Sequence, residues 1–285
     1  MALPAHRLLI AILLPLAACA RQPEPKPVER TQTNEQGCTR QRSVGPQDPF
    51  ADPAPLKQAC LGPHLLEIPQ NYFYNQIGTE HDGSYALALE YPSLQPFKPG
   101  ERMHLKVDVS VRTVTVDYTY IDRIDVREVL RREYTPMEYL QGDPEEALES
   151  RIQGKSVDGL TPYHVDMDKV RSHYRAKGFR ENAPVMSINW HTDWFIARDG
   201  KGEVSTVIKC TPDEIAASGV EYRDGKMVKS KGVGVARCDH TFMIADLDVI
   251  IRIKYPREGR SQWQQIEQRA RQLLEDSFIK PGKEA

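Results

Sequence analysis

Residues 249–278 read VIIRIKYPREGRSQWQQIEQRARQLLEDSF, and this stretch decides the fold class. The run from Val249 to Tyr255 is rich in β-branched residues and predicts a strand. The apolar residues after Gly259 recur at helical spacing on one face, opposite glutamine, arginine and glutamate, and they are Trp263, Ile266, Ala270, Leu273, Leu274 and Phe278. Pro281 and Gly282 end this helix. We therefore expect a C-terminal amphipathic helix packed on a sheet.

The preceding sequence supplies further strands. Leu65–Ile68 and Tyr85–Tyr91 predict two strands, each followed by a proline, and valines alternate with polar residues from Leu105 to Val111. Pairs of apolar runs also flank short polar turns, which is typical of hairpins, and these pairs are 194–197 with 204–208, 222–223 with 226–228, and 233–244 with 249–255. Sequential pairing of this kind predicts antiparallel sheets.

Two helices are expected between the strands. Asp143-Pro144-Glu145-Glu146 combines an N-cap residue, an early proline and first-turn acids. Asp168 and Gly178 bracket a second helix. The fold class that follows is α+β, with antiparallel β-sheets and helices packed on one face.

The amino terminus predicts export. Arg7 precedes an apolar run, Leu8–Leu14, that is too short to span a bilayer but has the length of a signal-peptide core. Leu16-Ala17-Ala18-Cys19 follows and resembles the cleavage motif of bacterial lipoproteins. The resemblance implies that residues 1–18 are removed, that Cys19 carries a diacylglyceryl thioether, and, because Ala20 follows, that the outer membrane is the favoured location. An ordinary secretory peptide is the alternative.

Four cysteines remain after Cys19, namely Cys38, Cys60, Cys210 and Cys238. An even number in an exported protein predicts two disulfides. Three pairings are possible, and proximity favours Cys38–Cys60 and Cys210–Cys238. The alternative is that one pair stays reduced.

Composition divides the mature chain. Residues 19–57 hold the lipidated cysteine and many prolines among polar residues, so we expect an extended tether. We expect an N-terminal α+β part over 58–190 and a C-terminal α+β part with the closing helix over 191–285.

The same composition excludes several functions. The net charge of −2 makes nucleic-acid binding improbable. The chain lacks a Gly-x-Ser-x-Gly elbow, a His-Glu-x-x-His motif, a phosphate-binding glycine loop and Cys-x-x-Cys spacing. His164, Asp166 and Asp168 could hold a hard cation if extended, but a helix cap is the more ordinary role for such acids. We therefore expect no catalytic residues, no metal and no cofactor.

Two aromatic clusters suggest a protein-binding surface. Tyr72, Phe73 and Tyr74 lie between amides, and Trp190, His191 and Trp194 lie among polar residues. Tyrosine and tryptophan are enriched at interfaces, although core packing is the alternative for each cluster. These six residues are the candidate partner-binding set.

Several segments together resemble the lipoprotein immunity proteins that protect bacteria with a type VI secretion system from their own phospholipase effectors. The segments are Cys60-Leu61-Gly62 with Leu65–Pro69, Cys238-Asp239-His240-Thr241-Phe242 with Val249–Tyr255, and the Trp263–Phe278 helix. The resemblance is best over residues 200–280, and residues 113–190 align to nothing. It implies a lipid-anchored periplasmic inhibitor whose partners are a phospholipase toxin and, through its anchor, the membrane.

Two other functions fit parts of the sequence. A structural or assembly lipoprotein of the envelope or of a secretion system would need the same anchor. A periplasmic enzyme would use the His164, Asp166 and Asp168 cluster. The leading hypothesis remains an immunity protein without catalysis of its own.

Overall fold

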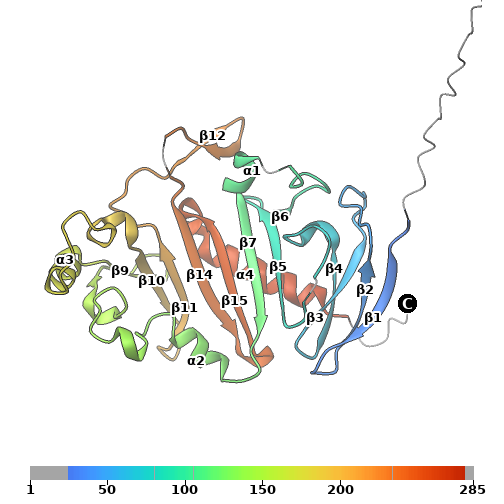
Figure 1. Ribbon diagram of the computed structural model, residues 1–285, viewed down its shortest axis with the longest axis horizontal. Coiled ribbons are helices and arrows are strands. Elements are labelled where there is room, and N and C mark those ends of the chain that lie inside the picture. Colours follow the sequence, from blue (N-terminus) through green and yellow to red (C-terminus); the bar gives the residue numbers. More distant parts are fainter. Residues whose placement is uncertain (1–24, 80, 105, 233, 280–285) are drawn as a thin grey trace, which may run out of the picture.

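A computed structural model describes residues 25–79, 81–104, 106–232 and 234–279. Its centre is a nine-stranded antiparallel sheet (Figure 1). In spatial order the strands are β6 (Gln95–Pro96), β5 (Ser84–Glu90), β7 (Thr113–Tyr120), β15 (Val249–Pro256), β14 (Arg237–Ile244), β11 (Val204–Cys210), β10 (Asp193–Arg198), β9 (Thr161–His164) and β8 (Ile152–Gln153). The antiparallel α+β prediction is confirmed.

The sheet joins early and late parts of the chain. β7 pairs with β15, with Val116 opposite Ile253, so a strand from the first half lies against one from the end. The expected boundary near residue 190 falls between β9 and β10, which are hydrogen-bonded neighbours. Two separate parts are therefore not observed, because one continuous sheet and one large core include residues from both.

The C-terminal helix α4 (Trp263–Ser277) covers one face of the sheet and crosses behind its central strands in Figure 1. Its apolar stripe, including Ile266, Ala270 and Leu274, is buried in the core as predicted. The Tyr118 hydroxyl on β7 donates a hydrogen bond of 2.8 Å to the Ala270 carbonyl in the helix. Apolar burial and this polar contact fix the helix across the sheet.

The opposite face is only partly covered. Helix α2 (Val126–Arg131) begins at its N-cap Asp125 and buries Val126 and Leu130 against β10, β11 and β15. Beyond α2, this face presents polar side chains, because residues alternate between the two faces along each strand. We call the uncovered part the open sheet face.

Two hairpins stand beside the edge formed by β5. They are β1 (Val28–Thr33) with β2 (Thr39–Val44), and β3 (Leu56–Leu61) with β4 (His64–Pro69). The predicted tether over 19–57 is therefore wrong from residue 28 onward. The first hairpin is held by the Cys38–Cys60 disulfide and by an Arg40–Asp82 ion pair of 2.7 Å rather than by an apolar stripe. Residues 1–24, with the predicted signal peptide and Cys19, lie outside the described residues.

Both favoured disulfides are present. Cys38–Cys60 joins the first hairpin to the second. Cys210–Cys238 joins β11 to β14 at directly opposed positions, with 4.0 Å between the two Cα atoms. All four cysteines are buried, so each bond lies inside a packed region.

Two local predictions are wrong. Val107–Val111 forms a short helix, α1, in place of a strand, and Arg112, with φ −95° and ψ 4°, ends the helix just before β7. The segment after Asp143 forms turns and the 3-10 helix Leu148–Ser150 in place of an α-helix. The acids there make tertiary contacts instead, since Asp143 and Glu145 both accept a hydrogen bond from the Tyr174 hydroxyl.

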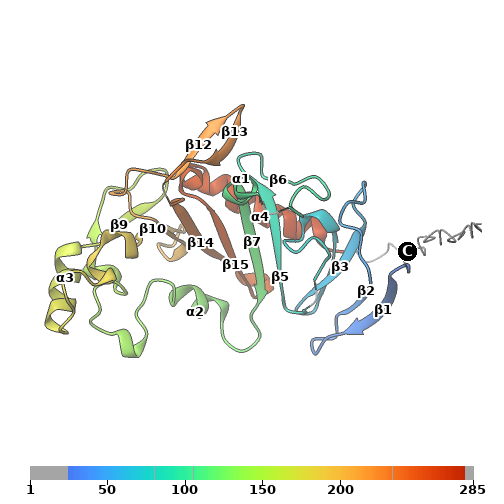
Figure 2. The same ribbon diagram turned by 45° about the horizontal axis from the view of Figure 1, so that its top comes forward.

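The remaining elements project from the sheet. Helix α3 (Met167–Ala176) follows β9, with Asp166 as the N-cap in place of the expected Asp168. The hairpin of β12 (Val220–Arg223) and β13 (Lys226–Lys229) turns at Asp224-Gly225 and stands away from the sheet in Figure 2. Among the described residues, no helix combines the length and the apolar character needed to cross a bilayer.

Candidate functional site

The structure divides the six predicted partner-binding residues by exposure. Phe73, His191 and Trp194 are 1%, 4% and 3% exposed, so the prediction that they are surface anchors is wrong. Tyr74 and Trp190 are exposed at 55% and 68%. Tyr72 is half-buried against the core.

These residues do not form one patch. The Tyr74 amide bonds to Ala86 on β5, whereas Trp190 precedes β10, and four strands separate β5 from β10. Phe73 is drawn inward because it forms an isolated bridge with Leu87 on β5. A single interface that contains both clusters would have to span most of the sheet.

Trp194 and His191 serve the fold. The Arg151 guanidinium lies 3.8 Å from the Trp194 ring centroid, and the Lys209 ammonium lies 4.6 Å from it. His191 donates from Nε2 to the Val185 carbonyl at 2.8 Å and from Nδ1 to the Glu145 carboxylate. Burial lowers the pKa of His191, but these two hydrogen bonds outweigh burial, and its pKa is raised above the ordinary value.

His164, Asp166 and Asp168, the alternative metal-binding set of the sequence, do not converge on one point among the described residues. Asp166 accepts from the Lys169 amide as the α3 cap, and Asp168 lies in the first turn of that helix. His164 instead meets Asp193, to whose carboxylate its Nδ1 donates at 2.9 Å, and Asp213. The Asp193 oxygens also accept from the Val165 amide at 3.0 Å and the Asp213 amide at 3.1 Å. The buried carboxylate therefore fastens two loops to β10.

Sequence reasoning missed Asp193 and Asp213. A usable signal was present, since Asp193 is an acid that directly precedes the apolar run Trp194–Ala197. A carboxylate at that position is buried when the strand is central to a sheet, and burial requires hydrogen-bonding partners. The partners come from residues 164, 165 and 213, which are distant in sequence.

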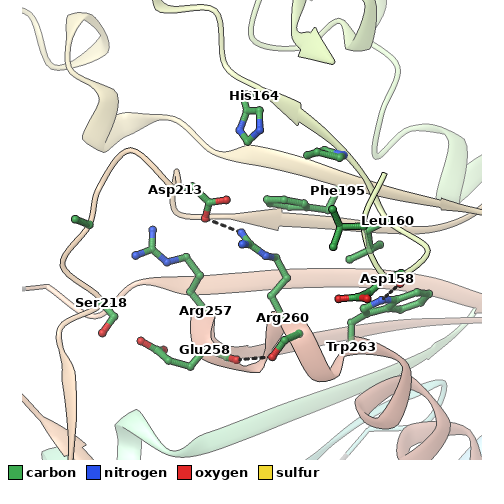
Figure 3. A pocket seen from close by; sticks show the side chains of 14 residues that line it. Asp158, Leu160, His164, Phe195, Asp213, Ser218, Arg257, Glu258, Arg260 and Trp263 are labelled. Carbon is green, nitrogen blue, oxygen red and sulfur yellow. Dashed lines mark hydrogen bonds and ion pairs between the residues drawn. The ribbon is translucent and has the colours of Figure 1, made fainter. Parts of the chain in front are cut away.

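A cavity of about 570 Å³ lies beside this cluster (Figure 3). It opens between the loop before β9, the segment after β11 and the 3-10 helix Arg257–Gln262 that leads into α4. Its apolar wall contains Leu160, Phe195 and Trp263. The Trp263 indole donates to the Asp158 carbonyl at 3.0 Å, which ties the loop to the helix.

Charged groups in the cavity are fixed by the protein. The Arg260 guanidinium donates to Asp213 Oδ1 at 2.7 Å and lies 4.1 Å from the Phe195 ring centroid. Arg257 donates to the carbonyls of residues 211, 212 and 215. Glu258 Oε2 is buried without a hydrogen-bond partner among the described residues.

This arrangement is suited to binding. Apolar walls with a few fixed polar groups are the usual make-up of a binding pocket. Nucleophilic catalysis needs a hydroxyl or thiol hydrogen-bonded to the base, and among the described residues no serine, threonine or cysteine side chain bonds to His164. Among the described residues, the cavity combines an apolar wall with fixed polar groups, without a nucleophile hydrogen-bonded to His164.

The open sheet face carries alternating charges. Lys209 on β11 lies opposite Asp239 on β14, which in turn lies opposite Lys254 on β15. Lys254 and Asp239 form an ion pair of 3.4 Å. Glu133 forms two ion pairs, with Lys209 at 3.5 Å and with Arg252 at 3.2 Å. In the described part of the chain, these charges of both signs on the open sheet face are therefore paired with one another.

Comparison with known proteins adds one informative match. The structure is similar to Smlt3025, an immunity protein of the Stenotrophomonas maltophilia type IV secretion system. The match has a TM-score of 0.68 and 26% sequence identity, and it covers 88% of this chain and 99% of that chain. The chain therefore has the fold of a secretion-system immunity protein.

A second structure is more remote. The iron-regulated outer membrane lipoprotein FrpD of Neisseria meningitidis aligns over 87% of this chain and 100% of that chain, with 11% identity and a TM-score of 0.41. Nothing about function follows from a likeness this low. No known protein family and no curated protein matches the sequence.

Proposed function

We propose that this chain is a lipid-anchored immunity protein of the cell envelope that binds and inhibits a toxic effector of a secretion system. The observation that carries the proposal is the similarity to Smlt3025 over nearly the whole length of both chains. Similarity confined to one hairpin or helix would indicate only a shared element, whereas this match includes the sheet, its helix and the connecting loops.

The amino terminus supports the location. The Leu16–Cys19 motif predicts a lipidated cysteine and an exported chain. Two disulfides are the chemistry expected of a protein in an oxidising compartment. A lipid anchor would confine the inhibitor to the membrane surface and raise its effective concentration there.

We further propose that the effector is a phospholipase. The sequence resemblance to immunity proteins against type VI phospholipases favours a phospholipase, which acts at the membrane where the anchor would hold the inhibitor. Smlt3025 is an immunity protein of a type IV system, whereas the sequence resemblance is to type VI immunity proteins. Experiment must decide which of the two systems delivers the effector.

The test uses the product of the neighbouring gene as the candidate effector, because we expect toxin and inhibitor to be encoded together. Cells that express that effector in the periplasm should survive when they also express the full chain, and the purified chain should abolish effector activity at a one-to-one ratio. Phospholipid hydrolysis by the effector alone would establish the phospholipase class, and another activity would replace it.

Two controls separate the alternatives. A Cys19→Ser variant should still inhibit the purified effector but protect cells less, because it lacks the anchor. Deletion of the gene should poison only cells that carry the active effector. If deletion instead blocks secretion with no toxicity, the protein is an assembly lipoprotein and the immunity proposal fails.

A further inference from the structure

A second cavity, of about 390 Å³, lies at one end of the open sheet face and is lined by basic residues. Its floor comes from β7, with Thr113 and Thr115, and its wall comes from the segment that includes α1. Five basic residues line it, and no aspartate or glutamate does so among the lining residues that the structure describes. These basic residues are Arg102, His104, Lys106, Arg237 and Lys254. We call it the basic pocket.

Arg102 is fixed in the wall of this pocket. It is buried, and its Nη atoms donate to the carbonyls of Asn71, Phe73 and Tyr74 at 3.1, 2.6 and 2.7 Å. Its Nε atom is buried with no hydrogen-bond partner among the described residues. Burial lowers the pKa of Arg102 to about 10, against an opposing effect of Tyr74, and the group stays charged at neutral pH. Carbonyl groups orient this charge but do not neutralise it.

The other cations are also poorly compensated. In the described part of the chain, no carboxylate lies within ion-pair distance of Arg102, Lys106 or Arg237. Among the described residues, the Arg237 guanidinium donates to the Ser110 carbonyl at 3.2 Å and to no carboxylate. Lys254 has two acidic neighbours: Asp239, in an exposed ion pair of 3.4 Å, and Asp117, whose pKa is raised by burial against the opposing effect of the Lys254 and Arg252 charges. Uncompensated cations around a concavity attract an anion.

The basic pocket is continuous with the open sheet face. Thr115, Lys254 and Arg237 belong to β7, β15 and β14, and their neighbours Val116, Ile253 and Cys238 point into the core on the other side. Figure 1 shows α1 at one end of β7 and α2 near the opposite end of the sheet, with the open face between them. The exposed aromatic side chain of Tyr74 lines the same pocket. A partner that covers the open face would therefore also cover the pocket.

We propose that the basic pocket receives an acidic segment of the bound toxin, which inserts aspartate or glutamate side chains between Arg102, Lys106 and Arg237 while Tyr74 packs against its backbone. The cavity volume exceeds that of one small anion and suits several linked side chains. Outside the pocket, Glu133 forms ion pairs with Arg252 and Lys209, whereas the described lining of the pocket holds five basic residues and no carboxylate, so positive charge is concentrated there. This inference rests on the proposed function, because the toxin is the partner.

The first test needs no toxin. A hexaglutamate peptide is titrated into the purified chain at low ionic strength, with inorganic phosphate and phosphatidylglycerol vesicles as separate probes. The wild type should bind the peptide, and the double variant Lys106→Ser, Arg237→Gln should bind it at least tenfold more weakly. Lys177→Ser, Arg198→Gln is the matched control, because Arg198 likewise donates to one carbonyl, that of Gly202, and both residues are exposed. The control should bind as the wild type does.

Other outcomes overturn the proposal. Binding of phosphate without the peptide would define a phosphate site, and vesicle binding that the double variant loses would define a lipid-headgroup site. Failure of all three probes would leave no anion site. In each case the circular dichroism spectrum of the double variant should match that of the wild type, since both substituted side chains lie at the surface of the fold.

The second test uses the same candidate effector, the product of the neighbouring gene. If the wild type inhibits it and the double variant inhibits it at least tenfold less well, the pocket is part of the toxin interface. If both inhibit equally, the pocket proposal fails and the immunity function stands. If neither inhibits while hexaglutamate still binds, the immunity function fails and the anion site stands.

Discussion

Removal of the Cys210–Cys238 disulfide should cost the protein a large share of its stability. The two residues are 28 positions apart in sequence. For a closed loop of this length, the chain-entropy relation gives about 3.6 kcal/mol at 25 °C. The variant Cys210→Ala, Cys238→Ala also removes two buried sulfur atoms from the core, which adds a packing loss to the entropic value.

The assay is urea unfolding at 25 °C with Cys19→Ser in the background, so that no lipid is present. If the slope is about 3 kcal/mol per molar urea, the midpoint falls by about 1.2 M. The matched control is Cys38→Ala, Cys60→Ala, whose loop of 22 residues gives about 3.4 kcal/mol by the same relation.

The two pairs should differ in a second measurement. Cys210–Cys238 links strands that are already neighbours within the sheet, whereas Cys38–Cys60 links two separate hairpins. Loss of the latter should therefore speed hydrogen exchange in β1 and β2 alone. A loss below about 1 kcal/mol for Cys210–Cys238 at unchanged slope would refute the reasoning, because the constraint on the unfolded chain would then be absent.

Three further outcomes are expected. Trp194→Ala should lower the free energy of unfolding by about 3–5 kcal/mol, because this side chain is buried between two cations, whereas Trp190→Ala on an exposed side chain should change it by less than about 1 kcal/mol in the same urea titration. The pKa of His191 is higher in the folded chain than its unfolded value near 6.5, so protonated His191 stabilises the fold fully below about pH 6.5. The free energy of unfolding should therefore decline as pH rises through the folded pKa. Glu145→Gln should flatten this decline in unfolding curves measured over a series of pH values, and an unchanged decline would contradict the role of Glu145. Gly219→Ala should lower the thermal midpoint by several degrees, since a Cβ atom there would lie 1.9 Å from the Gly234 carbonyl oxygen and φ is +75°; an unchanged midpoint would show that the loop relaxes freely.

The sequence predicted the elements whose stability is local. The hairpin of β10 and β11 follows from its turn, where Asp199 Oδ1 accepts from the amides of Lys201 and Glu203 and Gly202 takes a positive φ. Helix α4 could be predicted because its apolar residues recur on one face, and the residues on that face are the ones buried in the structure. Proximity in sequence also indicated both disulfide pairs.

The failures have a common physical cause. β1 is almost entirely exposed, so it has no alternating apolar pattern, and it forms because a disulfide and the Arg40–Asp82 pair hold its hairpin. The acids after Asp143 bind Tyr174 and His191 from distant parts of the chain instead of capping a helix. Contacts of this range leave no periodic signal in a sequence. The basic pocket was missed for the same reason, since Arg102 and Arg237 are far apart in sequence and line one cavity only in the folded chain.

If Cys19 carries the proposed lipid, the early start of the first hairpin limits how far the folded domain can lie from its anchor. Since β1 begins at Val28, the stretch between a lipidated Cys19 and the folded body spans at most about 30 Å. Each copy could then bind an effector only close to its own anchor on the membrane. Protection would scale with the number of copies per unit area of bilayer, and an effector that enters far from any anchor would act before lateral diffusion brought an inhibitor to it.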